Sequence, residues 1–463
     1  MCDILGIVGS IRSNYKHIHL LKEMVLEAED SSDLNVKILE SIHMFSNTDI
    51  GVAHALLGAY KNGASIDFIS ITNIFSRNNL AIYGDKLQYE TISDLDEIDT
   101  LDLDKVSYDE FLKKIDKADG IILGTPVYFG DRSSVANKFL QLTQKSHLLK
   151  NKAFGVVSSG AKRNGGQETA NIYSLYEALM QKAVATGNGP QTAQYGGTIW
   201  AGDVGKATGD KFGLETSYGT GRQVSSLAKI LSAEEDSFTE VLKVTVVVSM
   251  DTQEREFEKL VHGLFKKFSS DEIEINVLNL IDGNIYRCIA CAVCPSPKHV
   301  EKFSDQEYPY HCIIQTKKDS MNVIQKELVQ SDCIVIVGVN SDKNLIYRYQ
   351  AFMERTRFIR HDDFELTNIP IIGMLINELG ATNNPIFNVK VLTSFIRHNT
   401  CFLKPMEVII SNSKIVHQSD FAEYIPLLRK IKNGRSSSEP VAISYKATGY
   451  EDKQLDHTYK LRK

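Results

Sequence analysis

Short apolar runs rich in branched residues alternate along the chain with longer stretches in which apolar positions recur at helical spacing. In the first half the apolar runs occupy 4–8, 66–71, 120–124, 154–157 and 193–199. Apolar residues at 50–60 and 135–142 repeat every three or four positions, which predicts amphipathic helices. Strands that alternate with helices predict βαβ units around a parallel sheet.

The alternation stops at 232–241, SAEEDSFTEV, and then starts again. The second half has predicted strands at 243–249, 272–280, 333–338, 369–375 and 406–411. We predict an α/β fold with two doubly wound parallel sheets in tandem. The predicted domains are 1–235 and 236–435, followed by a polar tail at 436–463 that wraps a surface or stays disordered.

Composition narrows the class of protein. The 463 residues are too many for one compact core, and 43% of them are hydrophobic, as in ordinary globular proteins. The net charge of −6, with no block of Lys or Arg, argues against nucleic acid as a partner. No run approaches the roughly 20 apolar residues that span a bilayer, and no signal peptide opens the chain. We therefore expect a cytoplasmic protein with no membrane partner.

The first of three unusual loops follows the first predicted strand, and ligands of doubly wound sheets bind where strands end. In GSIRSN at 9–14, Ser10 offers a hydroxyl and Arg12 a guanidinium for a phosphate. A second candidate for the phosphate opens the 50–60 helix, where FSNTD supplies Ser46, Asn47 and Thr48. These residues either bind an anion with their amides and hydroxyls or simply cap the helix.

Two further loops suit a planar, partly polar heterocycle. GTPVYFG combines bare backbone with flat apolar surface, through Thr125, Pro126, Val127, Tyr128, Phe129 and Gly130. In GAKRNGGQETA, glycines allow close backbone approach and polar side chains can bond ring edges. Its candidates, with the end of the preceding strand, are Ser159, Gly160, Arg163, Asn164, Gly165, Gly166 and Gln167. Each loop alone is typical of an ordinary turn, but three on one sheet edge favour a ligand site.

These segments, with 200–224, resemble the NADPH-dependent FMN reductase and iron–sulfur flavoprotein family of the flavodoxin-like superfamily, over about residues 4–231. The resemblance implies two flavodoxin-like sheets and FMN, with its phosphate at Ser10, Arg12 and 46–48 and its ring between 125–130 and 159–167. It implies an oxidoreductase that takes electrons from NAD(P)H and passes them to a small-molecule acceptor or a redox protein. No catalytic residue is assigned, although Tyr128 and Arg163 are the nearest polar candidates.

Two further features follow from the resemblance. The family places flavins near subunit interfaces, so the second domain or a homodimer is expected to complete the site. The chain departs from the family pattern at 13–45, which separates GSIR from SNTD and carries its own helix-like stretch. SNYKH at 13–17 and FSNTD at 45–49 could each bind the phosphate, and we favour 46–48 because the sequence after it continues as the family does.

Four of the seven cysteines fall between residues 288 and 312. Cys288, Cys291 and Cys294 have the C-x-x-C-x-x-C spacing of cubane iron–sulfur clusters, whereas structural zinc more often uses two separated pairs. Cys312 resembles the family's fourth ligand, at a longer separation than the family norm. We predict a [4Fe–4S] cluster on these four cysteines, with zinc or free thiols as alternatives. Cys333 lies in a buried strand pattern and is expected to pack in the core.

The second half lacks the flavin loops. Its counterparts are SMDTQERE, GVNSDKN and ELGATNNP, and the acids of the first would repel a phosphate. We therefore predict a degenerate flavin site in the second domain and an FMN-dependent oxidoreductase overall. The alternatives are an electron carrier or redox sensor without a substrate of its own, and a scaffold of two relic domains. The intact GGQE loop argues against the scaffold.

Overall fold

The computed structural model describes residues 2–71, 105–190, 192–233, 240–289, 312, 314, 318–340, 347–360, 364–380 and 386–437. The chain forms two compact units. The first unit comprises Met1–Asn188 and Gln194–Ser232, and the second comprises Gly189–Ala193 and Ala233–Lys463. In the part of the chain that is described, no helix has the length and apolar character to cross a membrane.

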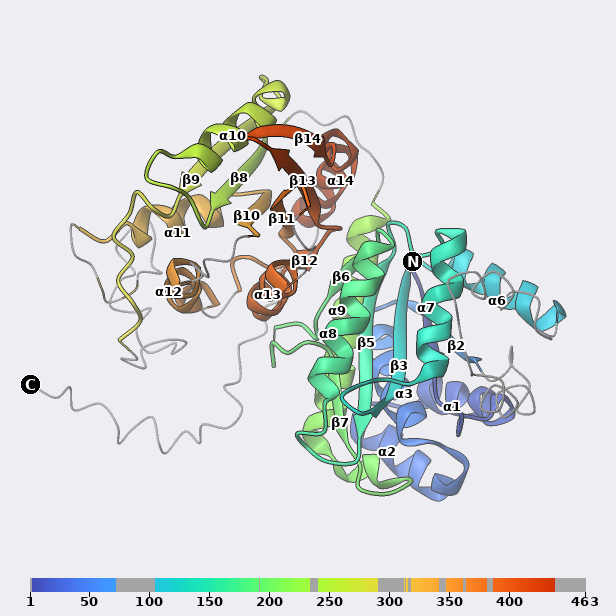
Figure 1. Ribbon diagram of the computed structural model, residues 1–463. Coiled ribbons are helices and arrows are strands. Elements are labelled where there is room, and N and C mark those ends of the chain that lie inside the picture. Colours follow the sequence, from blue (N-terminus) through green and yellow to red (C-terminus); the bar gives the residue numbers. More distant parts are fainter. Residues whose placement is uncertain are drawn as a thin grey trace, which may run out of the picture. The chain divides into compact units, whose positions relative to one another are not determined.

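The first unit is built on a mostly parallel sheet with the strand order β2-β1-β3-β5 (Figure 1). Beyond β5, the strand β6 pairs with the start of β5 and β7 pairs with the end of β5. The order is that of flavodoxin-like doubly wound sheets. The strands are β1 (Asp3–Val8), β2 (Ser65–Ser70), β3 (Gly120–Tyr128), β4 (Asp131–Arg132), β5 (Ala153–Gly160), β6 (Val184–Thr186) and β7 (Gly197–Trp200).

Most helices of the first unit pack against this sheet. The helices are α1 (Tyr15–Glu27), α2 (Ser31–Glu40), α3 (Asn47–Lys61), α6 (Lys105–Lys117), α7 (Ser134–Ser146), α8 (Gln167–Met180) and α9 (Lys211–Leu231). α2 packs instead on α1, α3 and α9. α3 and α9 cross with their backbones in contact, because a Cβ at Gly221 would lie 1.6 Å from the Ala55 carbonyl oxygen. On its other side α3 contacts β1, β3 and β5.

Two details of the first unit differ from the predicted elements. The run at 193–199 was expected as one strand, but Ala193 and Gly196 have φ of 48° and 132°, so the strand starts only at Gly197. The short strand β6 was not predicted.

The extra segment at 13–45 forms α1, α2 and a 3-10 turn at Ile42–Met44 before the chain reaches α3. The 9–14 loop and α3 are therefore separated in sequence but adjacent in the fold.

The second unit repeats the architecture with the strand order β9-β8-β10-β11. Both β12 and β13 pair with β11, as β6 and β7 pair with β5, and β14 adds an antiparallel edge. The strands are β8 (Leu242–Val248), β9 (Ile273–Asn279), β10 (Cys333–Val339), β11 (Pro370–Glu378), β12 (Cys401–Phe402), β13 (Met406–Ser411) and β14 (Lys414–Gln418). The predicted fold class of two tandem flavodoxin-like sheets is thus confirmed.

The helices of the second unit follow its strands in the same alternation. They are α10 (Glu256–Phe265), α11 (Met321–Val329), α12 (Tyr347–Thr356), α13 (Ile386–Phe395) and α14 (Ile425–Ser436). Cys333 is completely buried in β10, as its strand pattern predicted. Apart from its first two residues, the polar tail lies outside the described residues.

Candidate functional site

The loops that follow β1, β3 and β5 meet at one edge of the first sheet. Gly9 N donates to the Gly124 carbonyl at 2.8 Å, which holds the first loop against the end of β3. Ser133 Oγ donates to the Gly9 carbonyl at 2.6 Å from the far side of the second loop. The structure therefore brings together the three loops that the sequence singled out.

In the first loop, Ser10 is buried and Arg12 is exposed. Ser10 Oγ accepts a hydrogen bond from Arg12 N at 3.3 Å, and Ser13 N donates to the Ser10 carbonyl at 3.0 Å. The loop is thus a tight turn around the Ser10 hydroxyl. That hydroxyl still has its proton to donate, and the Arg12 side chain is accessible to a ligand.

The N-terminus of α3 has a reciprocal cap. Ser46 Oγ accepts from Asp49 N at 3.2 Å, and Asp49 Oδ2 accepts from Ser46 N at 2.7 Å. Ser13 Oγ donates to the other oxygen of Asp49 at 2.7 Å, which ties the first loop to the helix. Burial raises the pKa of Asp49. Capping and anion binding are compatible here, since the amides of Asn47 and Thr48 have no partner within the helix and remain for an anion.

Side chains of the second loop divide into an inner and an outer set. The hydroxyl of Thr125 is buried, where it accepts from Ser133 N at 3.0 Å and donates to the Pro126 carbonyl. Tyr128 is 54% exposed and Phe129 is fully exposed, with a φ of 52° that bulky residues rarely adopt. The loop therefore exposes the aromatic rings of Tyr128 and Phe129 at the sheet edge, whereas the Thr125 hydroxyl is hydrogen-bonded within the loop. Val127 and Gly130 flank this surface, in β3 and in the turn that follows it.

The second and third loops touch at two glycines. Gly166 has a φ of 101°, and a Cβ there would lie 2.6 Å from Gly130 Cα. Gln167, the first residue of α8, shapes the third loop with its amide: Nε2 donates to the carbonyls of Lys162 and Ile199, and Oε1 accepts from Gly165 N at 2.9 Å. Its side chain is therefore committed to the loop, a role that the sequence did not reveal.

Ser159 and Gly160 end β5, and Asn164 lies in the turn between β5 and α8. Ser159 Oγ is 2.8 Å from Thr48 Oγ1, so the third loop also reaches the N-terminus of α3. A Cβ at Gly160 would lie 2.7 Å from Gln167 Nε2, which explains the small residue there.

Sequence reasoning missed the partners of Arg163. Its guanidinium bonds the carboxylate of Asp210 and donates to the Thr198 carbonyl at 3.3 Å. It also lies 5.7 Å from the ring centroids of both Trp200 and Phe212. Asp210 is buried, and its second oxygen accepts from Trp200 N at 2.6 Å. The sequence that supplies these partners is WAGDVGKATGDKF at 200–212: Trp200 ends β7, and Asp210 and Phe212 follow it.

FMN fits this arrangement. Two free helix amides, the hydroxyls of Ser10 and Ser46 and the exposed guanidinium of Arg12 suit a phosphate dianion. Tyr128, Phe129 and the bare backbone of Gly130, where a Cβ would meet nothing within 4 Å, suit a flat ring.

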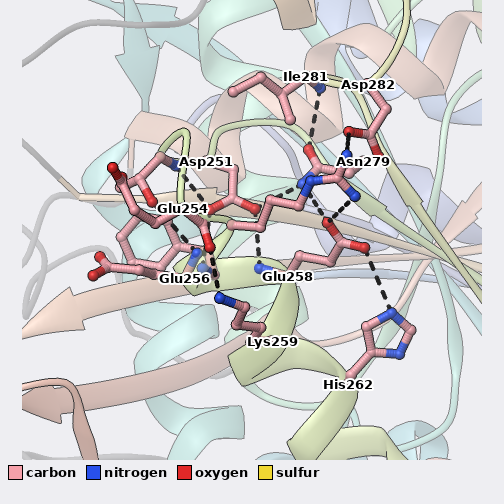
Figure 2. Close-up of polar contacts among 12 residues, drawn as sticks. Asp251, Glu254, Glu256, Glu258, Lys259, His262, Asn279, Ile281 and Asp282 are labelled. Carbon is pink, nitrogen blue, oxygen red and sulfur yellow. Dashed lines mark hydrogen bonds and ion pairs between the residues drawn. The ribbon is translucent and has the colours of Figure 1, made fainter.

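The corresponding corner of the second unit already contains an anion. Asp251, after β8, accepts from the amides of Thr252 (2.8 Å), Phe257 (2.9 Å) and Glu258 (3.1 Å), the last two being in the first turn of α10. Figure 2 shows Asn279 between two carboxylates: its Nδ2 donates to Asp251 at 2.7 Å and to Glu258 at 2.9 Å. The carboxylate of Asp251 occupies the amides that a phosphate would need.

Of the four cysteines predicted to hold a cluster, Cys288 and Cys312 are described, whereas Cys291 and Cys294 lie outside the described residues. Cys312 is buried and Cys288 is partly exposed. Within the described part of the chain, no set of three or more His, Cys, Asp and Glu side chains is arranged to hold a metal ion.

Comparisons with known proteins give a family match and several relatives. Residues 2–185 match the family model for NADPH-dependent FMN reductase. An iron–sulfur flavoprotein of Methanocaldococcus jannaschii is 41% identical over 132 residues, which are 27% of this chain and 65% of that protein. An iron–sulfur flavoprotein of Methanosarcina thermophila is 29% identical over 133 residues, again 65% of its length. The chain thus spans about two thirds of the length of these two relatives.

An NAD(P)H dehydrogenase (quinone) of Trichlorobacter lovleyi matches over a larger share of its own length. It is 27% identical over 187 residues, which are 37% of this chain and 85% of that protein. Among solved structures, a WrbA-like flavodoxin of Agrobacterium tumefaciens has a TM-score of 0.27 and 16% identity, covering 50% of this chain and 98% of its own. Residues 2–185 of this chain are thus similar in sequence to the NADPH-dependent FMN reductase family.

Proposed function

We propose that the chain is an FMN-dependent oxidoreductase that takes electrons from NAD(P)H and reduces a small-molecule acceptor of the quinone type. The observation that carries this proposal is the meeting of three loops at the edge of the first sheet, through Gly9–Gly124, Thr48–Ser159 and Gly130–Gly166. When bound, FMN supplies the hydride and electron chemistry, and the protein positions it.

The residues of the first unit have distinct tasks in this proposal. Ser10, Arg12 and the N-terminus of α3 would hold the phosphate, while Tyr128 and Phe129 would contact the ring. Arg163 would keep a positive charge near the ring edge, because Asp210 and two aromatic rings fix its position. The exposed aromatic surface leaves one side open to a donor or acceptor, or to a second copy of the chain. Sedimentation velocity would show whether the homodimer forms.

A matched pair of variants tests the phosphate site. Asp caps a helix as well as Ser does, so Ser46→Asp should keep α3 while placing a negative charge where the phosphate binds. FMN affinity should fall by at least about tenfold, and NAD(P)H oxidation at limiting FMN should fall with it. Gln253→Asp adds the same charge to an exposed position after β8 and should change neither.

The proposal is contradicted if the unmodified protein shows no saturable FMN binding, or if Ser46→Asp binds FMN as well as Gln253→Asp does. Either result would leave the loops of the first unit without their ligand.

We also infer a second candidate function, an iron–sulfur flavoprotein that carries electrons without a substrate of its own. It is favoured by the two described cysteines of the second unit and by the names of the relatives from Methanocaldococcus and Methanosarcina. The two candidates differ in turnover. An enzyme should reduce quinones catalytically with NAD(P)H, whereas a carrier should be reduced once and then need a protein partner.

A further inference from the structure

The second loop of the candidate site is the tip of a β-hairpin. Val127 and Tyr128 of β3 pair with β4 in antiparallel fashion, so Phe129 and Gly130 form a two-residue turn. Their φ values of 52° and 81° are both positive, as in the type I′ turns that connect such hairpins. β4 has only two residues, and a two-stranded ribbon of this length is not stable by itself. Contacts outside the hairpin must therefore fix the place of its two aromatic side chains.

The side chain of Arg132 in β4 bonds both neighbouring helices. Its Nε donates to Asn137 Oδ1 in the first turn of α7, and its Nη2 donates to the Glu177 carboxylate near the end of α8. Asp131 lies beside it, with Oδ1 3.6 Å from Nη1. One guanidinium thus joins the hairpin to α7 and to α8.

α8 meets the hairpin at a second point. A Cβ at Gly166, immediately before α8, would lie 2.6 Å from the Cα of Gly130 at the hairpin tip. Gly166 and Glu177 are eleven residues apart in the sequence. That separation corresponds to about 16 Å along a helix. Two contacts so far apart fix the direction of the hairpin as well as its distance from the third loop.

The Arg132 guanidinium is buried, whereas its partner is partly in solvent. The side chain of Arg132 is 6% exposed and that of Glu177 is 50% exposed. An apolar side chain of similar volume would often pack in such a place without loss of stability. The arginine adds direction instead, because its planar fork bonds Asn137 and Glu177 together in only one position of the hairpin.

The side chains that depend on this position are the exposed ones. Tyr128 is 54% exposed and Phe129 is fully exposed, so packing against protein atoms does little to hold their rings. Groups that contact a cofactor must be held to within a fraction of an ångström by the residues behind them. Arg132 is buried behind these two rings in the same hairpin and bonds the helix that carries the third loop.

We propose that Arg132 is a positioning residue that sets the place of Tyr128 and Phe129 against the flavin ring. This inference rests on the proposed function, because it takes the ring to lie against these two side chains. Since Arg132 bonds α7 and α8, its loss should disturb the ring end of the ligand and spare the phosphate end at Ser10 and Arg12.

The test compares the binding of FMN and of riboflavin, which has the same ring and no phosphate, to the full-length protein. Arg132→Met keeps an unbranched apolar chain and removes the charge. It should weaken both flavins by the same factor, at least about fivefold, while Ser46→Asp weakens FMN alone. Flavin fluorescence quenched by contact with the tyrosine ring should partly return. Arg132→Lys keeps the charge without the planar fork and should recover part of the loss.

A double variant separates positioning from a general loss of stability. If Arg132 acts through the aromatic rings, Arg132→Met should change flavin affinity and quenching less in a Tyr128→Leu background than in the unmodified protein. Asp67→Asn is the matched control, because Asp67 bonds Lys22 and Lys114 on β2, two strands away from β3. It should lower the free energy of unfolding and leave flavin affinity and quenching unchanged.

The inference is overturned if Arg132→Met binds both flavins with the affinity and quenching of the unmodified protein, or if its effect is as large in the Tyr128→Leu background. If Arg132→Met does not fold, judged by circular dichroism, Arg132→Lys and Glu177→Gln decide, and both should show the same changes at smaller size. Failure of the unmodified protein to bind either flavin would instead overturn the proposed function, and this inference with it.

Discussion

The helices α3 and α10 each precede an edge strand of their sheet, β2 and β9, yet their first amides meet different acceptors. At α3 the cap is the neutral hydroxyl of Ser46, which binds only the amide of Asp49 and leaves that of Thr48 for a ligand. At α10 the carboxylate of Asp251 binds both corresponding amides, those of Phe257 and Glu258. The first turn of α3 therefore leaves an amide open to an anion, whereas the first turn of α10 is bonded to a carboxylate of the protein itself.

The comparison teaches that strand order alone does not decide where a flavin binds, because a single side chain can occupy the site. It also separates two roles in the chain. The first unit keeps the loops that suit a flavin, and the second carries the cysteine-rich segment at 288–312. Each difference can be tested by a variant in one unit and its counterpart in the other.

The largest effect is expected at the contact between the second and third loops. Gly166→Ala would combine a φ of 101° with a Cβ 2.6 Å from Gly130 Cα, so the loops must move apart. We expect a loss of at least about 2 kcal/mol in the free energy of unfolding of the first unit and at least about tenfold weaker FMN binding. Urea unfolding followed by the fluorescence of the chain's one tryptophan, Trp200, reports on this unit.

Gly380→Ala is the counterpart in the second unit. Gly380 follows β11 and has a φ of 86°, but a Cβ there would meet nothing within 4 Å. It should cost only about 1 kcal/mol and leave FMN binding unchanged. Equal effects of the two substitutions on FMN affinity would show that the contact between the loops does not shape the flavin site.

A smaller effect is expected from Asp251→Ala, which leaves the amides of Phe257 and Glu258 without their acceptor. The second unit should lose about 1–2 kcal/mol of unfolding free energy, as helices do when an N-cap carboxylate is removed, and FMN content should stay the same. Circular dichroism detects this loss, while Trp200 fluorescence should not.

Asp30→Ala removes the corresponding cap of α2, where Asp30 accepts from the amides of Ser32 and Asp33. Its cost should be similar but should be visible in Trp200 fluorescence. An Asp251 variant as stable as the unmodified protein would mean that the carboxylate does not hold these amides.

The smallest effect concerns a feature that both units share, a buried neutral histidine bonded to a hydroxyl. His54 Nδ1 is 2.8 Å from Ser31 Oγ, and burial lowers the pKa of His54 to about 3. Below the ordinary pKa near 6.5, His54 is protonated in the unfolded chain but stays neutral in the folded chain. The free energy of unfolding therefore falls as pH falls from about 6.5 toward 3. Between about pH 7 and pH 5.5 the loss should be about 1 kcal/mol.

His54→Gln should remove this part of the pH dependence in Trp200-detected unfolding. His398, bonded to Thr356 Oγ1 at 3.0 Å in the second unit, should keep its own contribution. A pH dependence that is unchanged by His54→Gln would show that His54 is not held neutral.

The regular parts of the fold could be predicted because buried parallel strands leave a direct trace as apolar runs. β1, β3, β5, β8 and β10 all lie on such runs. The divided fifth strand could not be predicted, since β6 is only Val184–Thr186 and the turn before β7 depends on the positive φ of Ala193 and Gly196. Short strands and turns of this kind carry little periodic pattern.

The loops of the candidate site were recognised from residue types, but the tasks of individual side chains were not. Gln167 bonds the loop internally, and Asp49 ties Ser13 to α3, because these contacts form between segments distant in sequence. The acids after β8 were expected to repel a phosphate; the structure adds that Asp251 accepts from the first amides of α10, which begins after Arg255 with its φ of 56°.

The number of FMN molecules per chain tests the central claim most directly. Full-length protein is saturated with FMN, freed of excess and denatured, and the released flavin is measured against protein concentration. We predict about one FMN per chain, lost in Ser46→Asp and retained in Asp251→Ala. About two per chain, or one that survives Ser46→Asp, would contradict the assignment of the flavin site to the first unit.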